Sequence, residues 1–92
     1  MRITFSPQMR EDEITITKQG DTLVINGEAF DFSDLPNGAT IPTGIVPCEW
    51  IVGPVERIDG IIHITIIRPH GRDASEGELF PQPIDAVDGK VI

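Results

Sequence analysis

The chain has 92 residues, of which 39% are hydrophobic and 24% are charged, and its only cysteine is Cys48. This length allows a single domain over residues 1–92 and excludes a second hydrophobic core. The lone cysteine excludes an intrachain disulfide and a thiolate metal cluster, and it suits a reducing compartment.

The charge balance is acidic, because 15 Asp and Glu residues oppose 7 Lys and Arg residues, for a formal net charge of −8. Nucleic acids and anionic membrane surfaces bind clustered basic side chains, and the sequence has no such cluster. The N-terminus has no apolar run of signal-peptide length, and the longest apolar stretch, residues 61–67, is too short to cross a bilayer. We therefore expect a soluble intracellular protein that binds neither nucleic acid nor membrane.

The N-terminal residues predict a short strand followed by a loop. Apolar and polar side chains alternate weakly over residues 2–5, and Ser6-Pro7 is expected to end this strand. Residues 8–12 are polar and are expected to form the loop.

Residues 13–32 predict a three-stranded antiparallel meander, because apolar and polar side chains alternate with the period of a strand. The second turn is predicted at Asn26-Gly27, a dipeptide that favours the type I′ hairpin turn. This turn places Leu23 opposite Phe30.

The first turn of the meander, over residues 18–21, allows several loop lengths. The register that we favour places Ile16 opposite Leu23. It also places Ile14 opposite Ile25, so that the large apolar side chains share one face, whereas a slip of one residue would scatter them. The predicted apolar wall comprises Ile14, Ile16, Leu23, Ile25, Phe30 and Phe32.

Residues 34–47 predict an extended connection between two sheets or over a sheet edge. Proline and glycine residues interrupt this segment and prevent a continuous helix or central strand. No other segment shows a convincing 3.6-residue apolar period, so we expect little or no helix.

Residues 50–68 predict a second hairpin with its turn at Asp59-Gly60. A two-residue turn pairs Ile58 with Ile61 and, farther from the turn, Glu56 with His63. The same register pairs Val55 with Ile64 and Gly53 with Ile66. Both faces of this hairpin carry apolar side chains, so we expect something to cover the second face as well.

Gly53-Pro54 interrupts the first strand of this hairpin. Proline donates no ladder hydrogen bond, so we expect a bulge here and an edge or bent strand over residues 51–58. Residues 69–83 predict a loop whose one large apolar anchor is Phe80. Residues 84–87 predict a last short strand.

The elements together predict an all-β fold. Two hairpin units with a proline-rich crossover are typical of a small antiparallel β-sandwich or a partly open barrel. The fold would be built from the meander at residues 13–32 and the hairpin at residues 50–68.

Glu56 and His63 form the one polar pair that the register places side by side. A carboxylate beside an imidazole can orient a general base or a metal-ligating histidine, as in a small metal-dependent hydrolase. His70, with Asp59 or Asp73, could add metal ligands, but the two histidines lack the spacing of a helical metal pair. A cross-strand polar pair is the commoner role. We therefore predict no catalytic residue, no cofactor and no metal site.

The cysteine and the tryptophan also have two interpretations. Cys48 lacks a neighbouring base that would make it a nucleophile, so burial beside Trp50 is favoured. Trp50 itself is either a core residue or an interface anchor. The predicted interaction surface comprises Trp50, Pro54, Glu56, Ile58, Ile61, His63 and Ile67.

Four phrases of the sequence carry a resemblance that extends over nearly the whole chain: MRITFSPQMR at residues 1–10, INGEAFDF at 25–32, VERIDG at 55–60 and RPHG at 68–71. They resemble a group of small uncharacterised proteins that bacterial prophages encode near phage tail and tail-fibre genes. The resemblance implies a phage context, a place in the bacterial cytoplasm or the virion, and a role in the tail or its assembly. It transfers no catalytic residue.

We therefore favour a non-enzymatic interaction protein that binds a phage structural or assembly protein, as a minor tail component or an assembly accessory, and that can form homo-oligomers. The edge near Gly53-Pro54 and the two apolar faces of the hairpin motivate this hypothesis. The alternatives are an acidic inhibitor of a host nuclease or DNA-binding protein, motivated by the charge of −8, and the small metal-dependent hydrolase.

Overall fold

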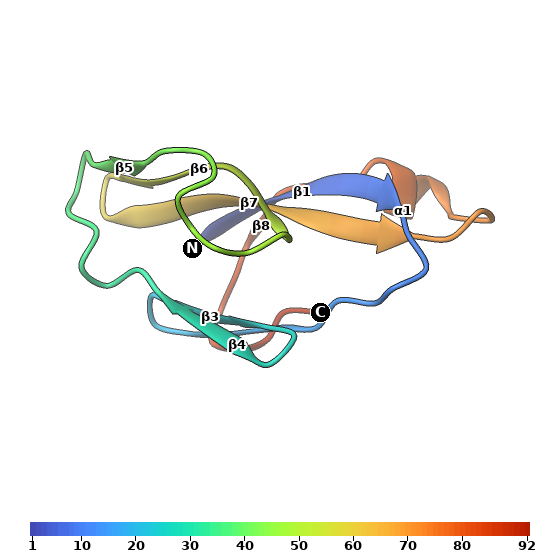
Figure 1. Cartoon of the computed structure of the whole chain (residues 1–92), viewed down its shortest axis with the longest axis horizontal. Helices are drawn as coiled ribbons and strands as arrows, with labels where there is room; N and C mark the ends of the chain where they lie inside the picture. The colour runs from blue at the N-terminus through green and yellow to red at the C-terminus, as the bar shows by residue number, and fades with distance from the viewer.

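The computed structural model describes all of residues 1–92 and is nearly all β, with two stacked sheets (Figure 1). Sheet A is mixed and has the strand order β5-β6-β7-β1-β8, whereas sheet B is antiparallel and has the order β4-β3-β2-β9. The sheets do not close into a barrel, so of the two predicted architectures the sandwich is correct. It was predicted to be antiparallel, however, and sheet A is mixed because β1 pairs with β7 in parallel. The elements are β1 (Arg2–Met9), β2 (Ile16–Gln19), β3 (Thr22–Ile25), β4 (Glu28–Asp31), β5 (Thr40–Ile41), β6 (Ile51–Ile58), β7 (Ile61–His70), α1 (Glu76–Leu79), β8 (Ile84–Asp85) and β9 (Gly89–Lys90).

The meander forms sheet B, and its second turn is as predicted. Asn26 and Gly27 have φ values of 48° and 82°, and Leu23 pairs with Phe30. Positive φ at both central positions is what a type I′ turn requires, and Asn and Gly tolerate it best.

The register predicted for the first turn is wrong by two residues. The loop is the dipeptide Gly20-Asp21, so Ile16 pairs with Ile25 and Lys18 pairs with Leu23. A shift of two residues keeps every side chain on its predicted face, because the side-chain period of a strand is two. The apolar wall therefore survives, but Ile14 precedes β2, and Lys18 lies on the inner face with its side chain 11% exposed.

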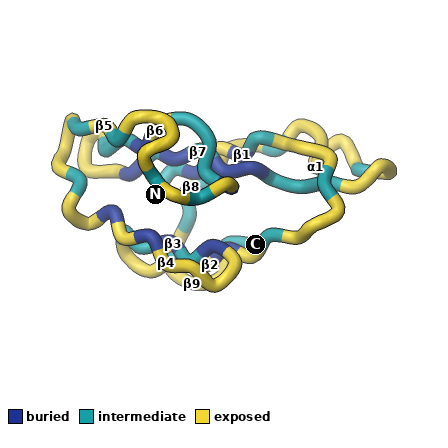
Figure 2. The backbone as a smooth tube through the Cα atoms, viewed as in Figure 1, coloured by how far each residue is buried: buried dark blue, intermediate teal, exposed yellow.

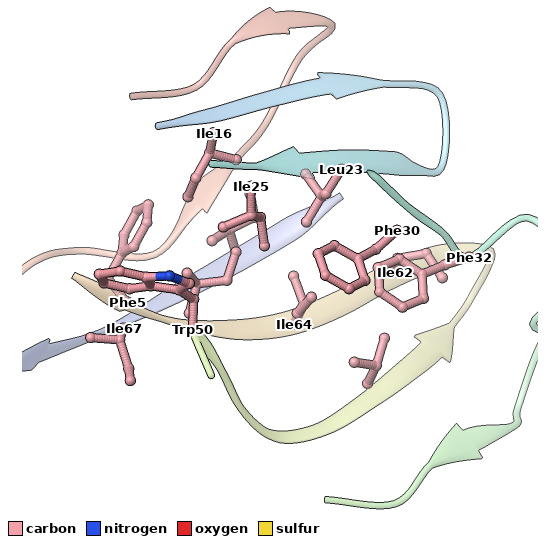
Figure 3. Close-up of a cluster of buried hydrophobic side chains, with 13 residues drawn as sticks. Phe5, Ile16, Leu23, Ile25, Phe30, Phe32, Trp50, Ile62, Ile64 and Ile67 are labelled. Atoms are coloured by element: carbon pink, nitrogen blue, oxygen red, sulfur yellow. The ribbon is translucent and has the colours of Figure 1, made fainter. Parts of the chain in front are cut away.

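The buried segments of the two sheets face each other, so the core lies between the sheets (Figure 2). None of its buried residues is polar or charged. Side chains from β2, β3 and β4 meet those from β1, β6 and β7 (Figure 3). Trp50 lies at one end of the core beside Ile67, and the backbone N–H of Ile67 donates to the carbonyl of Trp50. The buried residues are Ile3, Phe5, Ile16, Leu23, Ile25, Phe30, Phe32, Trp50, Val55, Ile62, Ile64, Ile66 and Ile67. All of the predicted apolar wall except the half-buried Ile14 belongs to this set.

Strand β1 continues through Pro7 to Met9, so the prediction that Ser6-Pro7 ends it is wrong, and it pairs with β7 in parallel. The N–H of Arg10 donates to the carbonyl of His70, so even-numbered residues of β1 direct their backbone polar groups toward β7. Pro7 then faces the opposite side, where β8 pairs only with Arg2 and Ile3. Its missing N–H costs no ladder hydrogen bond there, so the strand does not end at this proline.

The hairpin of β6 and β7 has the predicted turn and the predicted pairs Ile58–Ile61 and Glu56–His63. The predicted bulge is also present: the register shifts between Val52 and Glu56, and Gly53 has a φ of 74°. Beyond it, Ile66 pairs with Ile51 instead of the predicted Gly53, because the bulge inserts residues into β6. Strand β5 pairs with β6 beside this bulge, so β6 is a bent strand with only part of its length at an edge.

The C-terminal quarter of the chain connects the two sheets. The predicted loop contains α1, whose capping box joins Ser75 and Glu78. Phe80 is 70% exposed, so the prediction that it anchors this loop is wrong. Strand β8 then pairs with β1 in sheet A, and β9 pairs with β2 in sheet B. The four-residue α1 is the only helix, and it cannot cross a membrane.

Arg57 fastens the hairpin of sheet A to sheet B and the crossover. Its side chain is 13% exposed and points to the inner side of the sheet, since its ladder partner is the buried Ile62. The guanidinium donates to the carboxylate of Asp21 at 2.9 Å and to three carbonyl oxygens, those of Phe32 (3.2 Å), Leu35 (2.6 Å) and Gly60 (3.0 Å).

Replacing this side chain is expected to destabilise the fold. Arg57→Ala should lower the free energy of unfolding by about 2–4 kcal/mol, because it leaves partly buried carbonyl oxygens and a carboxylate without their donor. Urea denaturation measures this change. Arg72→Ala, at an exposed position with no ion pair, should change it by less than about 0.5 kcal/mol. Equal effects of the two substitutions would contradict the role of Arg57.

Asp88 fastens the C-terminal segment to β2. Its carboxylate accepts from Lys18 Nζ at 2.8 Å and from the backbone N–H of Gly20 at 3.0 Å. These hydrogen bonds, that of Lys18 first, hold the pKa of Asp88 below its usual value. A carboxyl whose pKa is lowered by folding stabilises the protein above its unfolded pKa, and that contribution is lost as the pH falls through the lower folded pKa.

We expect Asp88→Asn to have a lower free energy of unfolding than the wild type at pH 7. This difference in free energy should narrow as the pH falls below about 4. The amide keeps the shape of the side chain and removes its charge. Urea denaturation of both proteins at pH 7 and at pH 3 measures the two differences. A difference of the same size at both pH values would show that the charge of Asp88 contributes nothing.

Candidate functional site

The face of sheet A that points away from sheet B carries most of the predicted interaction surface; we call it the outer face. Five strands each contribute one side chain to a row that crosses it, because each residue is the ladder partner of the next. This charged row consists of Thr40, Glu56, His63, Arg2 and Asp85. Strands lie about 4.8 Å apart, so the row spans about 19 Å.

Within this row the predicted pair Glu56–His63 is side by side, but no hydrogen bond or ion pair joins the two side chains. The ion pair in the row is instead between Arg2 Nη1 and Asp85 Oδ1, at 3.1 Å. Thr65, two residues along β7 on the same face, makes no hydrogen bond to His63. The row therefore presents alternating charges to solvent and holds no nucleophile in contact with a base.

Beside the row, the hairpin tip exposes apolar side chains. Ile58 and Ile61 are ladder partners next to the turn and are 45% and 47% exposed. Pro54 is exposed at the bulge, and Glu56 and His63 are half-buried among their neighbours. These five residues of the predicted surface are accessible to a partner.

The other two residues of that surface, Trp50 and Ile67, are buried at 6% and 5% exposure, so neither is accessible on the surface of the single chain. Alternation along the strand placed Ile67 on the outer face with an accessible side chain, but it is buried and belongs to the same hydrophobic cluster as the tryptophan. Cys48 is half-buried and packs against this cluster, as predicted.

Arg10 covers the tryptophan from the solvent side. Its guanidinium lies 4.2 Å from the ring centroid of Trp50, and its Nε donates to Asp12 Oδ1 at 2.8 Å. The hydrogen bond between them raises the pKa of Arg10 and lowers that of Asp12. Glu49, 3.8 Å from the same guanidinium, adds a second carboxylate.

A cleft of about 520 Å³ is lined by residues 10–14 and by the end of β7. At this end of the sandwich, β1 and β7 extend past the shorter strands of sheet B (Figure 1). The linker from Arg10 to Ile14 forms one wall, and the end of β7 with Glu78 and Ile92 completes the lining. Most of the lining side chains are charged, with acidic and basic residues mixed. The cleft therefore suits a polar ligand better than an apolar one.

His70 lies in this cleft, remote from the charged row. Its Nδ1–H donates to the carbonyl of Gly71 at 2.9 Å, which leaves Nε2 as the free ring nitrogen. No group of three or more His, Cys, Asp or Glu side chains converges here or elsewhere in the geometry of a metal site. The structure thus does not bring His63 and His70 together with Asp59 or Asp73.

Sequence reasoning missed Arg2, Asp85 and Arg10. Arg2 and Asp85 are 83 residues apart, and only the pairing of β1 with β7 and β8 brings them beside Glu56 and His63. No local pattern in the sequence signals that pairing.

Comparisons of the chain with protein-family models, with curated proteins and with solved structures gave no match. The outer face and the cleft are therefore interpreted from their own chemistry.

The cover over Trp50 can be tested by fluorescence, since the chain has one tryptophan and no tyrosine. Arg10→Ala should shift the emission to longer wavelength and increase quenching by acrylamide, because it uncovers the ring. Arg72→Ala, an equal truncation away from the ring, should leave both unchanged. Identical spectra for Arg10→Ala and the wild type would show that the arginine does not shield the tryptophan.

Proposed function

We propose that this chain is a non-enzymatic interaction protein of phage or prophage origin that binds a phage structural or assembly protein, as a minor tail component or an accessory of tail or tail-fibre assembly. The observation that carries the proposal is the exposed apolar pair Ile58 and Ile61 at the hairpin tip, beside a row of charged side chains. Apolar contacts rimmed by charges are typical of protein–protein interfaces. The phage context rests on the resemblance of sequence alone.

Side chains, rather than strand edges, are the expected contacts. The bulge at Gly53-Pro54 distorts the exposed part of β6, and Pro7 lies on the open edge of β1. The open edge of β4 is four residues long and carries two acidic residues. Short, charged or proline-bearing edges resist the addition of a foreign strand.

A second candidate function, an acidic inhibitor of a host nuclease or DNA-binding protein, is favoured by the cleft. Four carboxylates line it, those of Glu11, Asp12, Glu13 and Glu78, against the two guanidinium groups of Arg10 and Arg68, and the chain has a net charge of −8. Binding of this kind would weaken steeply with added salt, whereas contacts through the isoleucines would not.

Capture from a lysate that produces the parent phage tests the primary proposal. We expect tagged wild-type protein to retain tail or tail-fibre proteins, identified by mass spectrometry. The double variant Ile58→Ser, Ile61→Ser should retain at least about ten-fold less of these phage proteins, because it removes the apolar anchors.

The matched control is Val87→Ser, which truncates a side chain that is 77% exposed and lies outside the hairpin. This control should capture as well as the wild type, and circular dichroism should confirm that all three proteins are folded. Undiminished capture by the double variant would refute the hairpin site, and recovery of a basic host nuclease would favour the second candidate.

A further inference from the structure

The order of charges in the row has a symmetry property. Reading across the outer face, the row carries a hydroxyl, a negative charge, an imidazole, a positive charge and a negative charge, from Thr40 to Asp85. The imidazole of His63 is at the centre, with Glu56 on one side and Arg2 on the other. Both neighbours are one strand spacing, about 4.8 Å, from it.

A two-fold axis that runs along β7 over His63 makes this row complementary to itself. Such an axis brings a second copy face to face with the first, reverses the order of the row and keeps the strand direction. Glu56 then lies over Arg2 of the second copy, and Arg2 over Glu56 of the second copy. At the ends of the row, the hydroxyl of Thr40 faces the carboxylate of Asp85.

The other face-to-face orientation is electrostatically unfavourable. A two-fold axis along the row, across the strands, would place Glu56 over Glu56, Arg2 over Arg2 and Asp85 over Asp85. Like charges in direct apposition cost several kcal/mol and exclude wrong pairings. The charges therefore select the axis along β7.

Apolar side chains support the same axis. Ile61 precedes His63 by two residues and occupies the neighbouring outer-face position of β7, so it too lies close to the axis and meets Ile61 of the second copy. It is 47% exposed in the single chain. Face-to-face sheets pack about 10 Å apart, a distance that side chains of this size can fill.

We propose that the outer face is a self-association surface whose occupant is a second copy of this chain, with Glu56 of each copy paired with Arg2 of the other. This inference deepens the proposed function on which it rests, because it names the first partner of the same face. The axis also places both hairpin tips at the same end of the pair. A phage protein would therefore meet Ile58 from two copies.

The dimer is expected to be weak. The paired faces measure about 19 Å by about 20 Å, or roughly 400 Å² per copy, about half of the roughly 800 Å² that a stable interface buries on each partner. The net charge of −8 on each copy also opposes association. Association should be measured at about 0.15 M salt. Repulsion between charges more than about 8 Å apart is screened at this concentration, whereas close ion pairs persist.

Charge reversal with mixing tests the pairing. Sedimentation equilibrium of the purified chain should show a monomer–dimer equilibrium with a dissociation constant of roughly 0.01–1 mM. Arg2→Glu and Glu56→Arg should each weaken it about ten-fold or more, because each places like charges in both cross-copy contacts.

Mixing these two variants in equal amounts should restore association to about the wild-type strength, since Glu56 of the first then meets Arg2 of the second, and the introduced charges meet each other. The mixture also has the same mean net charge as the wild type. Matched controls are Arg72→Glu in the exposed loop and Glu28→Arg on β4, which should associate no more strongly when mixed than when separate.

The possible outcomes distinguish this inference from the proposed function. A chain that is monomeric up to millimolar concentration, or a mixture of variants no more associated than either variant alone, would overturn the pairing. If capture of tail proteins nevertheless still depended on Ile58 and Ile61, the proposed function would stand. The outer face would then bind the tail protein and not a second copy of the chain. Thermal unfolding of each variant establishes that it is folded before association is measured.

Discussion

The guanidinium of Arg57 makes four hydrogen bonds, more than any other side chain of the protein, and they join the hairpin of sheet A to sheet B. Sheet B consists of strands of four residues or fewer, and the core between the sheets holds no polar group that could fix their relative position. Arg57 supplies that constraint: it reaches from β6 to Asp21 in the first turn of sheet B and to the carbonyls of Phe32 and Leu35, where the crossover begins. A charge-assisted bond with a planar donor fixes direction as well as distance, which apolar packing does not.

This constraint has a consequence for the outer face. Because Arg57 and the core residues of β6 and β7 face inward, alternation places Glu56, Ile58, Ile61 and His63 outward. The same hairpin therefore joins the sheets on one side and presents a mixed apolar and charged surface on the other. Residues on such a rigid strand pair lose little conformational entropy when a partner binds, which favours association through a small area.

Local features of the structure were predictable from the sequence. Asn26-Gly27 and Asp59-Gly60 specify their turns through the positive φ values that they tolerate, and Gly53-Pro54 specifies a bulge. The inner and outer faces of the meander were also predictable, since even the wrong first register differed by two residues and kept each side chain on its face.

Features that depend on distant segments were not predictable. The parallel pairing of β1 with β7 joins residues about 60 positions apart, and it alone places Arg2 beside His63 and allows β1 to pass through Pro7. The overhang of β1 and β7, which creates the cleft, depends on the relative lengths of strands in different sheets. The burial of Ile67 depends on where Trp50 packs, and the sequence does not show this. Each of these features is set by tertiary contacts and has no periodic signature in the sequence.

Isoleucine-methyl NMR tests the central claim most directly, because isoleucines mark both candidate surfaces: Ile58 and Ile61 lie on the outer face, and Ile14 and Ile92 line the cleft. Labelled protein would be titrated with tail and tail-fibre proteins from the parent phage. An interaction through the outer face predicts that the methyl signals of Ile58 and Ile61 shift or broaden while those of Ile14 and Ile92 stay in place. Changes confined to Ile14 and Ile92 would contradict the account and identify the cleft as the binding site.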